Sequence, residues 1–297
     1  MLFWVNMSCH ELSLVKHALL GFQHVFPQLR GKLATCWENL KVWEEQRATK
    51  LRPPLPVPLW LFMVGLARAH AKVAEDTSTA HMWRVFSVLL EIGLLCMLRP
   101  GELVKLCHTD VCLPGSFTLC QNHAALRVVS PKNRRQFGEH QFVLLKHANA
   151  VEWLRSIHDP SNAGTLWPCK KPRFAALFKQ LAGELGIKNC GFTPSSLRPG
   201  GATMFYNIGV PIASLRFMGR WSVERSLEHY VQLAMATQIL NRLAPRAVSR
   251  LKRLASLCLL QVPSKDWTHQ LADSVHTLRN SPASQLLNWC NTYVSLA

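Results

Sequence analysis

Tyr230, in the stretch SLEHYVQ, is one of only three tyrosines in this chain of 297 residues. One interpretation is an ordinary aromatic side chain on the surface of a helix. The other is a nucleophile, because a tyrosine oxygen can form a covalent intermediate. The choice between them depends on which groups the rest of the chain can bring near the phenol.

Two arginines are candidates for binding an anion. Arg99 stands in LLCMLRPGEL, where an apolar helix is expected to end, and Arg198 stands in TPSSLRPGGAT, at the start of a helix that Ser195 or Ser196 can cap. A guanidinium gives bidentate hydrogen bonds to phosphate oxygens and stays charged at any working pH. The helix dipole disfavours a cation at the position of Arg198, which favours an anionic partner there, whereas Arg99 could simply complement a helix C-terminus.

Two more side chains could take part in the same chemistry. Lys132 lies in VVSPKNRRQFG, a predicted turn after a strand, and Trp221 lies in FMGRWSVE, nine residues before Tyr230. With Arg134 and Arg135 beside it, Lys132 could instead belong to a solvated basic turn. Trp221 could be a packing residue of the core. No DxD, HxH or paired-carboxylate pattern of a metal site competes with this set.

The order Arg, Lys, Arg, Trp, Tyr resembles the catalytic domain of the tyrosine recombinases, the phage integrase family. LRPGELVKL is similar to the first arginine box of that family, including the acidic residue Glu102, and SSLRPGGAT is similar to the second box. From Arg198 to Tyr230 the resemblance runs without a gap and includes Ala202, Thr203, Gly209, Val210 and Trp221. There are two departures: Ser195 stands where the family has histidine, and Arg220 stands where it usually has glycine.

The resemblance implies an enzyme that breaks and rejoins DNA through a 3′-phosphotyrosyl intermediate, encoded by a mobile element, with no metal and no cofactor. It implies that Tyr230 is the nucleophile, that Arg99 and Arg198 bind the phosphate, that Lys132 is the general acid, and that Trp221 donates its indole N–H. Ser195 would complete the catalytic set, although a hydroxyl is a poor base. DNA-backbone contacts are expected from Arg134, Arg135 and Arg220.

Other functions remain open on the residues alone. The missing histidine suits a catalytically degenerate relative that binds DNA and no longer cleaves it, and a type IB topoisomerase-like enzyme would share the chemistry. The implied partner is double-stranded DNA, and the resemblance implies that four protomers could assemble on it. The 34 Lys and Arg residues against 17 Asp and Glu give a net charge of +17, which indicates a polyanionic partner.

The elements that must position these residues are predicted to form an α+β fold. It is mostly α-helical and contains one small three-stranded antiparallel sheet, whose strands are SFTLCQ, AALRVVS and QFVLLK. Residues 1–49 are expected to be part of a helical DNA-clamping domain, and residues 50–58, in KLRPPLPVPLW, a stiff proline-rich linker. Residues 59–250 would form the catalytic domain and residues 251–297 a helical tail. A single long helix is expected over 223–244.

The remaining composition bears on the compartment. The ten cysteines show no CxxC spacing, so we interpret them as thiols in a reducing compartment and not as metal ligands. The N-terminus lacks the features of a signal peptide, and the most apolar run, VFSVLLEIGLLCML, is short for a membrane span and contains Glu91. We therefore expect an intracellular protein that acts with DNA, in the nucleus if the source is eukaryotic, and no membrane partner.

Overall fold

The structure is a computed structural model, and it describes residues 12–46, 52–115, 122–131, 134–228 and 230–249. The chain divides into two compact units, residues 1–51 and 52–297. In the first unit, α2 (Leu12–Val25) and α3 (Ala34–Gln46) follow the predicted apolar spacing and are joined through a 3-10 turn, η1 (Pro27–Leu29). Among the described residues of this unit, Leu19 and Leu40 are buried, and an ion pair of 2.7 Å joins Lys16 to Glu44.

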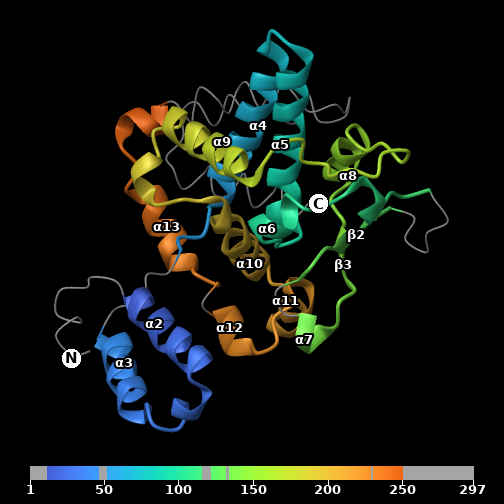
Figure 1. The fold of residues 1–297 in the computed structure, drawn as a ribbon. Helices are drawn as coiled ribbons and strands as arrows, with labels where there is room; N and C mark the ends of the chain where they lie inside the picture. Colours follow the sequence, from blue (N-terminus) through green and yellow to red (C-terminus); the bar gives the residue numbers. More distant parts are fainter. Residues whose placement is uncertain (1–11, 47–51, 116–121, 132–133, 229, 250–297) are drawn as a thin grey trace. The chain divides into compact units, whose positions relative to one another are not determined.

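Two long helices form the centre of the second unit (Figure 1). They are α4 (Val57–Val73) and α5 (Thr77–Leu95), and α8 (Ala148–Arg155) and α9 (Lys171–Glu184) pack against them. Asp76 caps α5 by accepting a hydrogen bond of 2.7 Å from the Thr79 N–H. Around the buried Phe86, aromatic rings meet edge to face, with 4.8 Å between its centroid and that of Phe174. This apolar centre gives α5 the rigidity to support the turn at its C-terminal end.

The predicted small sheet is present. Strands β1 (Val111–Cys112), β2 (Ala124–Val128) and β3 (Gln141–Leu145) are antiparallel in the order β1-β2-β3. Buried and exposed residues alternate along β2 and β3, so the sheet has one face in the core. The prediction of a mostly helical α+β fold is confirmed. The expected strand SFTLCQ lies outside the described residues, and β1 was missed because two residues are too short to show a period.

Shorter elements contain or adjoin most of the candidate site residues. They are α6 (Pro100–Leu103), η2 (His108–Asp110), α7 (Arg134–Phe137), η3 (Lys188–Cys190), η4 (Pro194–Ser196), α10 (Leu197–Asn207), α11 (Ile212–Gly219), α12 (Glu224–Glu228) and α13 (Leu233–Asn241). The basic turn expected around Arg134 is therefore a single helical turn.

The proline-rich segment is part of the packing of the second unit. Residues 52–56 are not helical, as the prolines predict, but α4 already begins at Val57, so Pro58 lies in its first turn. Leu55 is fully buried, and its N–H donates to the Ser196 carbonyl over 3.0 Å. This segment thus supports the start of α10.

Two local predictions were wrong. The helix expected over 223–244 is broken between α12 and α13, so Tyr230 lies in a turn. The serine cap of α10 is also absent: Ser196 is the N-cap residue, but its side chain makes no capping bond. Its hydroxyl accepts instead from the Thr193 N–H over 3.2 Å, because the 3-10 turn η4 leads directly into the helix.

Helix α10 approaches its neighbours at two glycines. A Cβ added to Gly201 would lie 2.1 Å from the Leu94 carbonyl oxygen, and one added to Gly200 would lie 2.5 Å from the Leu55 carbonyl oxygen. Both obstacles are backbone atoms, which cannot move without moving their elements. Only glycine lets α10 lie this close to the end of α5.

Replacing Gly201 with alanine is therefore expected to lower the free energy of unfolding by about 3 kcal/mol, the upper end of the usual cost of overpacking. The matched control is Gly183→Ala in α9, where nothing lies within 4 Å of the added Cβ. There, alanine should raise stability by about 0.5 kcal/mol through its better helix propensity. Urea unfolding of both variants measures the difference, and a Gly201→Ala protein as stable as the wild type would contradict this packing.

Candidate functional site: an arginine cluster beside Tyr230

The end of α5 turns sharply and presents Arg99. Met97 has φ of 49°, in the left-handed region, and the Leu98 N–H donates to the Gly93 carbonyl over 3.1 Å, which closes the turn. Arg99 is then the N-cap residue of α6, where the Glu102 carboxylate accepts from the Arg99 backbone N–H over 2.9 Å. This capping contact fixes Arg99 and Glu102 on one short turn.

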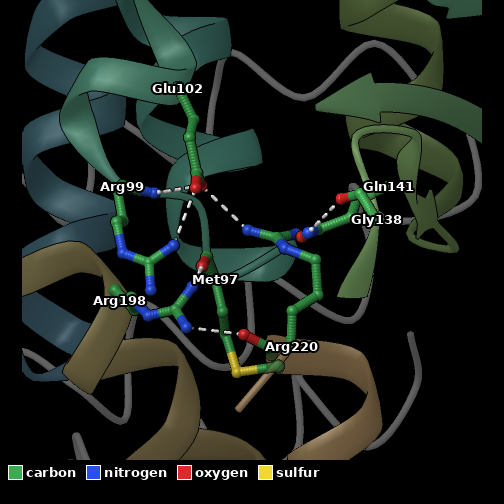
Figure 2. A network of polar contacts seen from close by, with 8 residues as sticks. Met97, Arg99, Glu102, Gly138, Gln141, Arg198 and Arg220 are labelled. Atoms are coloured by element: carbon green, nitrogen blue, oxygen red, sulfur yellow. Dashed lines mark hydrogen bonds and ion pairs between the residues drawn. The ribbon is translucent and has the colours of Figure 1, made fainter. Parts of the chain in front are cut away.

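Glu102 joins two guanidinium groups (Figure 2). Its Oε1 accepts from Arg99 Nη1 over 2.8 Å, and its Oε2 accepts from Arg220 Nη2 over 2.8 Å. The side chains of Glu102 and Arg220 are each 6% exposed, whereas that of Arg99 is 26% exposed. Arg99 is therefore the member of this network that solvent or a ligand can reach.

Arg198 extends from the first turn of α10 into the same cluster. Its Nη1 donates to the Met97 carbonyl over 2.6 Å and its Nη2 to the Gly219 carbonyl over 2.5 Å, so it ties the end of α5 to the end of α11. Arg198 is buried, and its Nε has no hydrogen-bond partner within the described part of the chain. A buried N–H without a partner is uncommon in a folded protein, which marks this part of the cluster as a polar group still to be satisfied.

Arg220 and Trp221 are placed by the end of α11. Arg220 is its C-cap residue in the left-handed conformation, with φ of 57°. Trp221 folds back over Gly219, where an added Cβ would lie 1.7 Å from a ring carbon of Trp221. Glycine at 219 is thus required for the indole to lie flat on the chain and to face the guanidinium of Arg198.

Tyr230 completes the arrangement. The Arg198 Cζ lies 4.4 Å from the Trp221 ring centroid and 5.7 Å from the Tyr230 ring centroid, within cation–π range for both. The two rings are 5.3 Å apart and inclined by 50°. Tyr230 is half-buried, and the Trp221 Nε1 has no partner among the described residues. The phenol therefore adjoins the arginine cluster, which we define as Arg99, Arg198 and Arg220.

Positive charge is in excess in this cluster. Three guanidiniums face one carboxylate, that of Glu102, which leaves a net charge of about +2 if all are ionised. Burial, followed by repulsion from Arg99 and Arg220, lowers the pKa of Arg198 to about 9. Burial also lowers the pKa of Arg220, although Glu102 acts in the opposite direction. An oxyanion bound beside Arg99 would relieve the repulsion among the three guanidiniums.

The solved structures that this chain matches include three structures of two recombinases, XerH and XerA. XerH bound to palindromic difH in a post-cleavage complex matches with 17% identity and a TM-score of 0.46, over 65% of this chain and 52% of the XerH chain. XerH in a pre-cleavage complex with difH gives 14% and 0.45, over 62% and 52%. The XerA recombinase gives 16% and 0.46, over 67% and 66%.

The chain is similar in fold to these tyrosine recombinases. It spans about half the length of the two XerH chains. No protein-family model matches the sequence, and no curated protein matches it.

The fold gathers most of the predicted site residues. Arg99, Arg198 and Arg220 lie together. Trp221 and Tyr230 lie beside Arg198. Ser195 lies in η4, half-buried, three residues before Arg198. Arg134 and Arg135 are exposed on α7. Lys132 lies outside the described residues.

Sequence reasoning missed three contributions. It noted Glu102 only as part of a motif, and the carboxylate proves to connect two arginines. It placed Arg220 on the DNA backbone, whereas its side chain is buried beside Glu102. It gave no role to Thr203, whose hydroxyl contacts the Tyr230 turn. The one local signal in the sequence for these contacts was Glu102, an acidic residue three positions after Arg99 in the turn RPGE.

Metal-ligand clusters and membrane spans are both absent from the described residues. These residues hold no cluster of three or more His, Cys, Asp or Glu side chains that could bind a metal ion. Within the same part of the chain, no helix is both long and apolar enough to cross a membrane.

Glu102→Gln is expected to destabilise the protein by about 3 kcal/mol at pH 7, because it leaves the buried Arg220 and the partly exposed Arg99 without their counter-ion. Burial alone would raise the pKa of Glu102, but Arg220, the Arg99 N–H and the Arg99 guanidinium together lower it. A lowered pKa means that the ionised carboxylate stabilises the fold above the unfolded pKa, and that this contribution is lost as the pH falls through the folded pKa.

The difference in stability between wild type and Glu102→Gln should therefore shrink below about pH 4.5, the carboxyl's ordinary value. Thermal unfolding between neutral and acidic pH measures this. Glu152→Gln is the matched control, because that carboxylate is 64% exposed and pairs with Arg155 at 3.5 Å; it should cost little at any pH. A penalty for Glu102→Gln that is the same at all pH values would contradict the assigned ion pairs.

Proposed function

We propose that this chain breaks and rejoins DNA as a tyrosine recombinase, with Tyr230 as the nucleophile. The observation that carries the proposal is the position of the Tyr230 ring, 5.7 Å from the guanidinium of Arg198, in a buried cluster with more cations than anions. A cationic pocket lowers the free energy of an anionic transition state, and a phenol beside it can attack the bound group. A phosphodiester supplies both the anion and the electrophile.

The proposed reaction exchanges one phosphodiester for another. The Tyr230 oxygen attacks phosphorus, a new bond to the 3′ phosphate forms, and the bond to the 5′ oxygen breaks. The phenol proton passes to solvent, and the leaving 5′ oxygen takes a proton from Lys132. Attack of a 5′ hydroxyl on the phosphotyrosine reverses these steps and reseals a strand. Because the phosphoester bond is retained throughout, the reaction needs no external energy source.

Each group of the site has a proposed part in this exchange. Arg99, the most accessible of the cluster, would donate to the non-bridging oxygens. The unpaired Nε of Arg198 is buried, so it would donate to the phosphate once the side chains that cover it move aside. The buried indole N–H of Trp221 is a further donor. Arg220 and Glu102 would hold Arg99 in orientation. Ser195 stays in the proposed set as a hydrogen-bond donor from η4.

The wider proposals rest on charge and on the resemblance. A net charge of +17 and the exposed Arg134 and Arg135 support double-stranded DNA as the partner. We further propose assembly of four protomers on DNA, an origin in a mobile element, and a location with DNA inside the cell, which is the nucleus in a eukaryote. In this proposal, residues 1–49 clamp DNA, residues 59–250 carry out catalysis and residues 251–297 form a helical tail.

A DNA-binding relative that no longer cleaves is the second candidate. Ser195 favours it, since a hydroxyl cannot replace the proton-accepting role of an imidazole at neutral pH. Arg198 also favours it, because both of its terminal nitrogens already donate to backbone carbonyls.

The test uses the full chain and a pool of nicked duplexes with a randomised core, because the target sequence is unknown. A nick near the cleavage position lets a short fragment diffuse away, so the covalent intermediate accumulates. After incubation with EDTA and denaturation in detergent, the proposal predicts DNA that remains attached to protein until a protease is added. Salt-sensitive binding without any detergent-resistant complex would reject the recombinase and support the second candidate.

A further inference from the structure

We propose that Thr203 acts as a latch that breaks the helix at Tyr230 and sets the direction of its phenol. This inference rests on the proposed function, because it assigns a positioning residue to the same nucleophile. Thr203 lies on α10, five residues after Arg198, and is buried. It is the point at which the helix that carries the guanidinium touches the segment that carries the phenol.

The Thr203 hydroxyl makes two hydrogen bonds to that segment. It donates to the Tyr230 carbonyl over 3.0 Å and accepts from the Gln232 N–H over 3.1 Å. Both partners are backbone groups, one on each side of Val231. One hydroxyl of α10 therefore bridges the backbone of Tyr230 and that of Gln232.

These two bonds replace bonds that a continuous helix would make. In an α-helix the Tyr230 carbonyl would accept from the N–H of Ala234, and the Gln232 N–H would donate to the carbonyl of Glu228. With the hydroxyl occupying both groups, α12 stops at Glu228 and α13 starts at Leu233. The apolar spacing of residues 223–244 predicts one helix, and this long-range contact interrupts it.

The break has a direct consequence for the phenol. The Tyr230 N–H donates to the Leu227 carbonyl over 2.7 Å, which ends α12 in a tight turn, and the ring then packs against Trp221. An uninterrupted helix would change the backbone direction at Tyr230 and carry its ring away from this contact. Because Arg198 and Thr203 share one helix, the cation and the latch move together, and the distance between cation and phenol is fixed by α10.

Thr203→Val removes the hydroxyl and keeps the shape of the side chain. We expect it to slow formation of the covalent complex by about 100-fold, since a displacement of about 1 Å in a reacting group has this effect. Thr203→Ser keeps the hydroxyl and should recover most of the rate. DNA affinity should be unchanged in both, because the hydroxyl faces the protein. Thr237→Val is the matched control, because its hydroxyl bonds only within its own helix, to the Leu233 carbonyl at 3.0 Å.

Hydrogen exchange supplies a measurement independent of activity. The Gln232 amide should exchange about tenfold faster in Thr203→Val than in wild type, as expected when one hydrogen bond is lost, and Thr203→Ser should protect it. If Thr203→Val does not fold, Thr203→Ala gives the same comparison with less steric demand. Wild type that forms no adduct would reject the proposed function and leave the exchange result to decide on the latch.

Three results would overturn the latch. The first is a Thr203→Val protein that reacts as fast as wild type. The second is Thr203→Ser that is as slow as Thr203→Val, since that would assign the effect to the methyl group. The third is unchanged exchange at Gln232 in Thr203→Val. Slower reaction with recovery by serine and faster exchange at Gln232 would together support it.

Discussion

Replacing Tyr230 with phenylalanine is expected to abolish covalent attachment to DNA and to leave DNA binding intact. The substitution removes one oxygen atom, and that atom is the proposed nucleophile. The phenyl ring would keep its contact with Trp221, at 5.3 Å between centroids, and its distance of 5.7 Å from the Arg198 guanidinium. Stability should therefore change little, and the backbone bond from Thr203 to the Tyr230 carbonyl is unaffected.

The chain contains its own control for this substitution. Tyr206 lies on α10 and is 42% exposed. Within the described part of the chain, its ring makes no contact with the arginine cluster. Tyr206→Phe should form adducts at the wild-type rate. The measurement is the fraction of end-labelled DNA that migrates with protein after denaturation. Adduct that persists in Tyr230→Phe, or that disappears in Tyr206→Phe, would assign the nucleophile elsewhere.

Arg198→Lys should reduce the rate of adduct formation by about 1,000-fold, comparable to the loss of a main transition-state donor. Lysine keeps the charge but cannot donate to the Met97 and Gly219 carbonyls and to a phosphate in one plane. It also loses the face that stacks 4.4 Å above the Trp221 ring. The slower adduct formation would therefore come from the changed geometry of the donor groups, because the net charge is the same.

Because Arg198 also holds two backbone segments together, its replacement will lower stability, and a second variant separates the two effects. Arg99→Lys changes a side chain that is 26% exposed and bonded to Glu102 on its own turn. It should fold normally and still react at least about 100-fold slower. Arg173→Lys, at an exposed position of α9, is the control and should react normally. Normal rates in Arg99→Lys at wild-type stability would remove Arg99 from the site.

Much of the fold, and several residues of the candidate site, could be predicted from the sequence. The apolar helix expected to end before Arg99 is α5, which ends at Leu95. Buried and more exposed residues alternate along β2 and β3, and this alternation places one face of the sheet in the core. Arg99, Arg198 and Tyr230 were selected by type and order, and the fold places them in one region.

The parts that could not be predicted depend on contacts between distant segments. The break at Tyr230 depends on the Thr203 hydroxyl, which is 27 residues away. The burial of Arg220 depends on Glu102, which is 118 residues away. The serine expected to cap α10 instead bonds inside η4, because a 3-10 turn precedes the helix. Local sequence patterns carry no information on contacts between residues so far apart. Each of the two segments, taken alone, is compatible with a different structure.

The central claim is that one phosphodiester meets both the arginine cluster and the oxygen of Tyr230. Mass spectrometry of the trapped complex, after digestion of protein and DNA, tests it most directly. We expect a single modified peptide that contains Tyr230, with a nucleotide attached through its 3′ phosphate to that tyrosine. A nucleotide on any other residue, attachment through a 5′ phosphate, or no covalent nucleotide in a preparation that binds DNA tightly would contradict it.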